Sequence, residues 1–332
     1  MQNRELFVHS SKMQNLTVVS INATSPKSFS VIVKVCVVIP FFCIFLCFIV
    51  VMLQIFASHK QFLDTSRYIL FTHMLINDAL QILSSVLLFL CVMGRVKLPL
   101  LFCIPLLLVC SCTFQNTTFI LAAMSLERYV AIFYPLQRPA SWRSDRIWII
   151  TLPLWIISFI FAINELFIGK HSPVDVLSTS MICKLTVINQ SPIQGVYRLV
   201  VYVLSFAVVG VIILFTYVRI VMDTRKMRQD RASVSKAMHT VLLHGFQLLL
   251  CLLAFTQPIS ETLIVLHTNW PPEDVAFFNF FCFILIPRFL SPLIYGFRDQ
   301  SLRKHIEKRF LCWSKKVFNQ LLPISHTCVS YS

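Results

Sequence analysis

Four acidic or strongly basic residues lie within stretches of the sequence that are otherwise almost entirely apolar: Asp78, Glu165, Glu261 and Arg288. A charge in an apolar interior is costly, and such residues form pairs or serve a function. Asp78 and Arg288 have opposite charges, so a direct contact would offset most of that cost. The alternative is that Arg288 binds backbone carbonyls while Asp78 is protonated or hydrated. Glu261 either attracts a cationic ligand or extends towards a polar boundary.

The other reactive residues do not form a catalytic pattern. The sequence contains no nucleophile–base arrangement, metal-binding motif or phosphate-binding loop, so it predicts neither an enzyme nor a cofactor. Most of the 12 cysteines lie in apolar stretches and are most simply small hydrophobic side chains. These are Cys36, Cys43, Cys47, Cys91, Cys110, Cys112, Cys251 and Cys282.

The elements that must position these residues are membrane-spanning helices. Hydrophobic residues make up 57% of the 332 residues and charged residues only 13%, about half the usual fraction of ~25% in soluble domains. Seven apolar stretches reach the ~20 residues that a helix needs to cross a bilayer. They are approximately Val35–Ser58, Tyr68–Met93, Leu98–Leu126, Ile147–Ile168, Leu199–Val218, Ala237–Leu266 and Val275–Phe297. The predicted fold is an all-α bundle of seven transmembrane helices.

The distribution of charge predicts how the bundle is oriented. The net charge is +15, and +12 of it lies on the side that includes the C-terminal tail. The positive-inside rule places this side in the cytoplasm and the N-terminus outside. The basic charge is therefore explained by topology and does not indicate a nucleic-acid partner. Two N-glycosylation sequons that begin at Asn15 and Asn22 agree with an outer N-terminal tail.

Two cysteines differ from the rest because they lie on the predicted outer side. Cys103 is near the start of the third span, and Cys183 is in the loop between the fourth and fifth spans. That side is oxidising, so a disulfide between them would hold the loop over the mouth of the bundle. The alternative is two unrelated thiols.

The third span ends in the run from Met124 to Ile132, followed by Tyr134-Pro135-Leu136. This run resembles the end of the third helix in rhodopsin-like (class A) G-protein-coupled receptors, and in the olfactory receptor family in particular. Other similar motifs are Leu75-Ile76-Asn77-Asp78, Lys236-Ala237 with Thr240 and His244, and Pro292-Leu293-Ile294-Tyr295. Cys103 lies 25 residues before Arg128, which is the family spacing for the disulfide cysteine.

Departures from the olfactory pattern indicate a divergent branch, similar to the odorant-receptor-like proteins of fish and amphibians. Glu127 stands where olfactory receptors usually have aspartate, and Ser291 replaces the asparagine of the seventh-helix motif. The absence of lysine from the seventh span separates the chain from opsins. Cys110, where amine receptors carry aspartate, separates it from those receptors.

The resemblance implies a ligand pocket in the outer half of the bundle and a conformational switch, rather than catalysis. By family position the pocket residues are Cys110, Ser111, Phe114, Gln115, Tyr202, Ser205, Thr256, Ile259, Ser260, Glu261, Leu263, Phe277 and Phe281. The switch residues are Asp78, Glu127, Arg128, Tyr129, Tyr217, Arg288, Pro292 and Tyr295. For each single pocket residue, the alternative is a role in helix packing alone.

The resemblance also implies the partners. A small-molecule odorant or another chemical ligand would activate a heterotrimeric G protein of the olfactory stimulatory type and raise cAMP. The alternatives are a class A receptor for a non-olfactory small molecule or peptide and, more distantly, a transporter or channel. Membrane lipids would surround a receptor in the plasma membrane.

The predicted organisation has three parts. Residues 1–30 form an extracellular glycosylated tail, residues 31–297 the transmembrane bundle, and residues 298–332 a cytoplasmic eighth helix and tail. The eighth helix begins at Arg298 and places Leu302, Ile306 and Phe310 on one face. Cys312, which follows it, is a candidate palmitoylation site.

Overall fold

The architecture is taken from a computed structural model of the chain. The structure describes residues 2–134, 137, 139–168, 180–183, 191–226, 270–298 and 302–309, with single residues or pairs of residues between 239 and 267. The predicted sixth span lies mostly outside the described residues.

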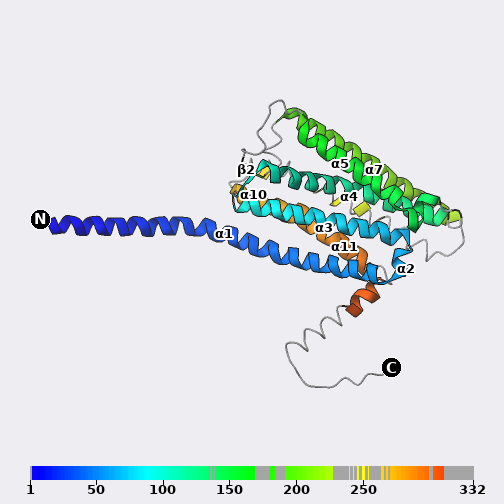
Figure 1. The fold of residues 1–332 in the computed structure, drawn as a ribbon, viewed down its shortest axis with the longest axis horizontal. Helices are drawn as coiled ribbons and strands as arrows, with labels where there is room; N and C mark the ends of the chain where they lie inside the picture. Colours follow the sequence, from blue (N-terminus) through cyan, green and yellow to red (C-terminus); the bar gives the residue numbers. More distant parts are fainter. Residues whose placement is uncertain are drawn as a thin grey trace, which may run out of the picture.

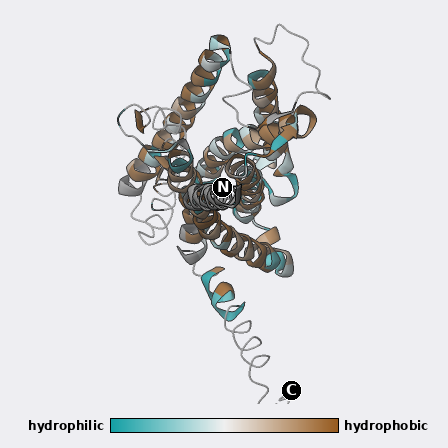
Figure 2. Cartoon of the chain, turned by 90° about the vertical axis from the view of Figure 1, so that its left-hand side faces the viewer, coloured by the Kyte–Doolittle hydropathy of each residue, from teal (hydrophilic) through white to brown (hydrophobic). Residues whose placement is uncertain are grey.

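Five long helices are apolar enough to cross a membrane. They are α1 (Gln2–Ser58), α3 (Ser66–Met93), α4 (Leu100–Phe133), α5 (Trp148–Phe167) and α7 (Pro192–Lys226). Helix α4 is central: α5 and α7 pack on one side of it, and α3 packs on the other, next to α1 and α11 (Figure 1). Hydrophobic residues cover most of the length of these helices (Figure 2), as expected of faces that contact lipid.

The seventh predicted span is helical but is divided into three consecutive parts. Helix α10 (Pro272–Asn279) leads into the π-helical segment η3 (Phe280–Leu285), and α11 (Ile286–Arg298) follows. A π-helical turn holds more residues than an α-helical turn and rotates the helix that follows. Arg288 lies in the first turn of α11, directly after this change.

The helices extend beyond the predicted apolar stretches. Helix α4 continues past Leu126 to Phe133, and α7 begins at Pro192 and reaches Lys226. Helix α1 starts at Gln2, so the backbone of the predicted N-terminal tail is continuous with the first span, whose apolar part is Phe29–Ser58. The N-terminal part of α1 extends beyond the bundle (Figure 1).

The predicted start of the third span was wrong by two residues. Leu98 belongs to the short strand β1 (Lys97–Pro99), and Pro99 directly precedes α4. Near the predicted eighth helix, α11 is described as far as Arg298, residues 299–301 lie outside the described residues, and residues 302–309 are helical. Its Leu302 and Ile306 are buried against the main core, whereas Phe310 lies outside the described residues.

A small two-stranded sheet closes one end of the bundle. Strand β1 pairs antiparallel with β2 (Ser180–Ile182), so that Lys97 lies opposite Ile182. At the same end, the first turn of α10 carries Glu273 and Asp274, which pair with Arg95 and Lys34 respectively. These contacts connect α10 to the turn that follows α3 and to the middle of α1.

Candidate functional site

A buried ion pair joins α3 to α11 in the interior of the bundle. Arg288 Nη1 lies 2.8 Å from Asp78 Oδ1, and the two side chains are only 5% and 0% exposed. The same nitrogen donates a hydrogen bond of 2.5 Å to Thr117 Oγ1 of α4. The direct contact suggested by the sequence is therefore present, and it connects three helices.

Polar side chains extend this contact across the bundle. Asn77 Nδ2 donates to Thr117 Oγ1 at 2.7 Å and to the Thr113 carbonyl at 2.9 Å. Asn116 Nδ2 in turn donates to Asn77 Oδ1 at 3.0 Å, and Ser158 Oγ of α5 lies 3.5 Å from Asn116 Oδ1. All five residues are buried. Each of these polar side chains has a hydrogen-bond partner on a neighbouring helix. The network therefore favours one specific packing of α3, α4 and α5 against each other.

A second acidic group is held at the opposite end of α4 from the sheet. Glu127 Oε1 accepts a hydrogen bond of 3.0 Å from Ser66 Oγ of α3. Arg128 Nε lies 3.8 Å from Glu127 Oε2, and both side chains are largely buried. The Tyr129 ring packs against Phe215 of α7, with centroids 5.8 Å apart. The predicted switch motif therefore contacts both neighbouring helices.

The other predicted switch residues lie on α7 and α11. Tyr217 is partly buried and packs against the main core. Pro292 lies inside α11 and is buried. Tyr295 belongs to the same helix, but its side chain lies outside the described residues.

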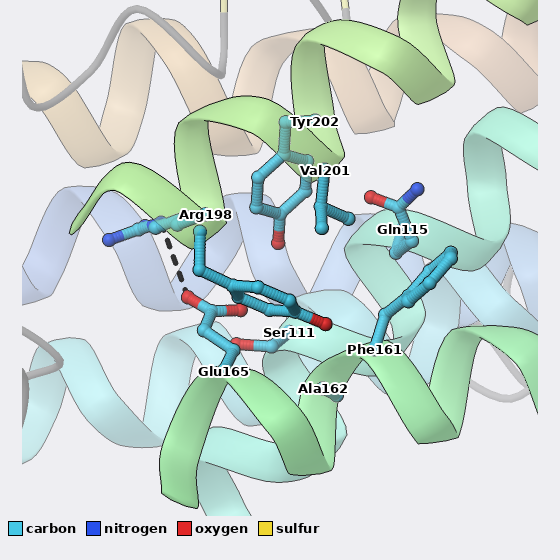
Figure 3. Close-up of a pocket in the computed structure, with 9 residues that line it drawn as sticks. Ser111, Gln115, Phe161, Ala162, Glu165, Arg198, Val201 and Tyr202 are labelled. Atoms are coloured by element: carbon cyan, nitrogen blue, oxygen red, sulfur yellow. Dashed lines mark ion pairs between the residues drawn. The ribbon is translucent and has the colours of Figure 1, made fainter. Parts of the chain in front are cut away.

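A small pocket opens between α4, α5 and α7, towards the sheet end of the bundle (Figure 3). It contains about 220 Å³ of space between atoms, including its open mouth. The lining residues are Ser111 and Gln115 from α4, Phe161, Ala162 and Glu165 from α5, and Tyr197, Arg198, Val201 and Tyr202 from α7. Aromatic walls surrounding a few polar groups are typical of small-molecule sites.

The two charged side chains that line this pocket form an ion pair. Arg198 Nε lies 3.2 Å from Glu165 Oε1, with side chains 29% and 4% exposed, and the two point towards one another in Figure 3. Ser111 of α4 lies beside Glu165 in the pocket (Figure 3). Gln115 Nε2 donates to Ser205 Oγ at 2.6 Å. Glu165 Oε1 and Gln115 Oε1 are buried and accept no hydrogen bond from the described part of the chain.

Three of the residues expected by family position line this pocket: Ser111, Gln115 and Tyr202. Ser205 belongs with them through its hydrogen bond to Gln115. Phe114 lies between the pocket and the buried ion pair, because its ring is 5.3 Å from that of Tyr202 and 5.7 Å from the Arg288 guanidinium.

Other expected pocket residues lie elsewhere. The Cys110 thiol lies 3.5 Å from polar atoms of Gln81 and Ser85 on α3. Phe277 and Phe281 stack on each other, and Phe281 contacts Phe41 of α1. Leu263 is about half exposed. Outside the described residues lie Thr256, Ile259, Ser260 and Glu261.

The sequence interpretation missed six lining residues, all on α5 and α7: Phe161, Ala162, Glu165, Tyr197, Arg198 and Val201. One signal was available, because Glu165 is an acid within an apolar span, and such residues indicate a function or a partner. Its partner Arg198 precedes the predicted fifth span and carried no comparable signal.

A disulfide supports the pocket from the side of the sheet. Cys103 and Cys183 are bonded, with Cα atoms 5.6 Å apart, as one of the two sequence interpretations predicted. Both pack in a small apolar cluster with Leu166, the residue after Glu165. Gln194 Nε2 also donates to the Leu166 carbonyl at 3.4 Å. The disulfide therefore connects the start of α4 to the end of α5 that carries Glu165.

The proposed modification sites are not described in atomic detail. Asn15 and Asn22 fall in the helical backbone of α1, but their side chains lie outside the described residues, as does Cys312. Within the part of the chain that the structure describes, no cluster of three His, Cys, Asp or Glu side chains could hold a metal ion.

Comparison with known proteins agrees with this architecture. The family described as 7 transmembrane receptor (rhodopsin family) matches residues 48–295. The chain is 30% identical to Odorant receptor 131-2 of Danio rerio over 205 residues, which is 58% of this chain and 60% of that protein. It is 27% identical to Olfactory receptor 51I1 of Homo sapiens over 210 residues, 58% of this chain and 62% of that receptor. The chain thus spans about three fifths of the length of these relatives.

The family match covers most of the chain, so the protein belongs to the rhodopsin family of seven-transmembrane receptors. It is a multi-pass membrane protein of a family of receptors, not of enzymes. The similarity to odorant and olfactory receptors confirms the family that the third-helix and seventh-helix motifs predicted.

Proposed function

We propose that this protein is a chemosensory receptor of the odorant type, in which a small molecule bound in the outer half of the bundle activates a heterotrimeric G protein. The observation that carries the proposal is the pocket between α4, α5 and α7, which combines aromatic walls with buried oxygens that accept no hydrogen bond from the described part of the chain. Its relatives' names, odorant and olfactory receptor, indicate the kind of ligand.

The proposed signal passes from the pocket to the opposite end of α4. A ligand shifts the receptor towards its active form only if it binds that form more tightly than the inactive form. In the active form Arg128 separates from Glu127, which it now contacts at 3.8 Å. The sixth span moves outward, and the basic cytoplasmic face contacts the G protein. The buried Asp78–Arg288 pair connects the helices through which this change is transmitted.

The proposed location is the plasma membrane, with the N-terminus outside and the C-terminus in the cytoplasm. The Cys103–Cys183 disulfide supports this orientation, because disulfides form on the oxidising side of the membrane. Glycans at Asn15 and Asn22 belong to the outer side, and a palmitoyl group at Cys312 to the inner side. Anionic lipids and the G protein share the basic inner surface.

A cAMP reporter assay in intact cells tests the proposal. The ligand panel contains amines, amino acids, bile acids and volatile odorants, and surface expression is measured in parallel. We expect at least one ligand class to raise cAMP, and Arg128→Ala to abolish the response at unchanged surface expression. A receptor that reaches the surface but raises cAMP with no panel member would contradict coupling to a stimulatory G protein.

A matched variant assigns the ligand's charge. Glu261→Gln removes the acid that the sequence suggested as a cation-binding group. A response lost in this variant at unchanged surface expression would support a cationic ligand bound at Glu261, and an unchanged response would show that the ligand does not need this acid.

A further inference from the structure

The pocket between α4, α5 and α7 contains two buried oxygens that accept no hydrogen bond from the described part of the chain: Gln115 Oε1, and Glu165 Oε1, which has the ion pair with Arg198. Both residues are at least nine-tenths buried, with 3% and 2% of their surface exposed. A buried acceptor without a donor is unfavourable. Since both oxygens belong to residues that line one small pocket, they favour a ligand that carries several donors. An ammonium group, with three N–H bonds, meets this requirement.

The charge of the pocket argues against a simple amine. Glu165 and Arg198 together are neutral, and they lie only 3.2 Å apart. A bound cation would add a net positive charge beside Arg198 in a medium of low dielectric constant, where repulsion is strong. A ligand with one positive and one negative group leaves the site neutral. It also gives each protein charge a new partner in place of the old one.

The two protein charges lie at different depths, which fixes how such a ligand is oriented. Arg198 is the more exposed side chain, at 29%, whereas Glu165 is 4% exposed. The ligand carboxylate therefore pairs with Arg198 near the mouth, since guanidinium binds carboxylate through two parallel hydrogen bonds. The ligand ammonium lies deeper, between Glu165 and Gln115. The apolar side of the pocket, including Phe161 and Val201 (Figure 3), is left for a hydrocarbon side chain.

We propose that this pocket binds a zwitterion, a small α-amino acid with an apolar side chain, by exchanging the Glu165–Arg198 ion pair for two ion pairs with the ligand. The inference rests on the proposed receptor function and specifies its ligand class. Loss of the pair that joins α5 to α7 also provides a conformational signal, because the ligand then connects the two helices in place of the direct contact.

A matched series of three compounds tests the charge requirement with the unmodified protein. L-Valine carries both charged groups, isobutylamine lacks the carboxylate, and 3-methylbutanoate lacks the ammonium. Binding to the full-length receptor in nanodiscs is measured directly and through the ligand-induced rise in unfolding temperature, with glycine, alanine and leucine to bracket side-chain size. We expect an apolar amino acid to bind at least about tenfold more tightly than either singly charged analogue, since each lost charged contact costs about a factor of ten or more.

Variants then assign the two charges to residues. Glu165→Gln and Arg198→Gln should each weaken amino-acid binding by about tenfold or more. The matched control is Glu273→Gln, which breaks the ion pair with Arg95 outside the pocket and should bind as the unmodified receptor does. The unfolding temperature without ligand reports whether each variant is folded. The compound series needs no variant, so it decides the question even if one fails to fold.

The outcomes separate this inference from the receptor function. If isobutylamine binds as tightly as valine, the proposal of a zwitterionic ligand is overturned. A failure of all four amino acids to bind would overturn it too. A cAMP response to other odorants without amino-acid binding would overturn the inference and leave the receptor function standing. Amino-acid binding without a cAMP response would support the ligand class and count against the proposed coupling.

Discussion

Among the described residues, two buried arginine–carboxylate pairs join one helix to another, and their surroundings differ. The Asp78–Arg288 pair is enclosed: its side chains are 0% and 5% exposed, and Arg288 Nη1 also donates to Thr117. The Glu165–Arg198 pair borders a pocket, and Glu165 Oε1 accepts no hydrogen bond from the described part of the chain.

This difference shows that a buried ion pair in a membrane bundle is not by itself a ligand site. The enclosed pair contacts three helices and continues into a network of amide and hydroxyl groups, so its role is to fix how those helices pack. The open pair joins only α5 and α7. Both pairs include a carboxylate oxygen that accepts no hydrogen bond from the described part of the chain, Asp78 Oδ2 and Glu165 Oε1. The adjacent pocket is therefore what makes the second pair available to a ligand.

The largest expected effect comes from removing the cation of the enclosed pair. Arg288→Met should lower the free energy of unfolding by about 3–5 kcal/mol, because Asp78 then stays buried without a partner. The equivalent change in the open pair, Arg198→Met, should cost less, about 1–3 kcal/mol, because Glu165 stays buried without its partner but borders the pocket. Unfolding of the two purified variants, followed by circular dichroism under identical detergent conditions, measures the difference.

A second substitution tests the cause of that loss. Adding Asp78→Asn to Arg288→Met removes the uncompensated charge and should recover part of the stability. Equal losses in the Arg288 and Arg198 variants, or no recovery in the double variant, would contradict the distinction between an enclosed and an open pair.

An intermediate loss of stability is expected when the disulfide beside the Glu165–Arg198 pair is removed. Cys183→Ser breaks the bond to Cys103 across a sequence separation of 80 residues, and the loss should be about 2–4 kcal/mol. Because the cysteines pack against Leu166, amide hydrogen exchange should increase at the end of α5 that carries Glu165. Exchange around Asp78 should not change.

A buried free cysteine of the same helix is the control for this prediction. Cys112 lies on α4 and forms no disulfide, so Cys112→Ser should leave exchange at the end of α5 unaltered. Faster exchange spread evenly over both ion pairs in Cys183→Ser would mean that the disulfide supports the whole bundle, and would remove this distinction between the two regions.

The sequence predicted most of the spans because lipid imposes a simple requirement on the chain. Every backbone polar group in the membrane must be satisfied within the segment, so long apolar runs become helices. Helix ends were less predictable, since α4 and α7 continue into polar sequence as far as Phe133 and Lys226. Hydropathy detects where a helix leaves the membrane, and not where its backbone hydrogen bonding stops.

The two ion pairs were predictable to different degrees for the same physical reason. Asp78 and Arg288 lie deep inside apolar runs, where each charge has few possible partners, and their contact could be predicted before the structure was known. Glu165 and Arg198 lie near the ends of their spans, where a charged side chain can reach water. Nothing in the sequence indicated that they pair, whereas family position indicated Ser111, Gln115 and Tyr202, which line the same pocket.

The smallest expected effect concerns a third, exposed ion pair, which extends the comparison to the surface. Arg95 follows the end of α3 and has a φ of 49°, a left-handed conformation that glycine adopts without strain. Its backbone N–H and that of Val96 bond the carbonyls of Val92 and Cys91, the pattern of a helix C-terminal cap. The side chain is 74% exposed and pairs with Glu273 at 2.6 Å, an arrangement worth only about 0–1 kcal/mol.

Two substitutions at Arg95 separate the backbone contribution from the ion pair. Both Arg95→Gly and Arg95→Ala remove the contact with Glu273, but only alanine keeps the left-handed strain, so the glycine variant should be more stable by about 1 kcal/mol. Thermal unfolding of both variants beside Glu273→Gln measures this difference. If Arg95→Ala proved as stable as Arg95→Gly, the strain at this cap would be negligible. A loss in Glu273→Gln as large as that in Arg288→Met would mean that exposure does not decide what an ion pair contributes in this bundle.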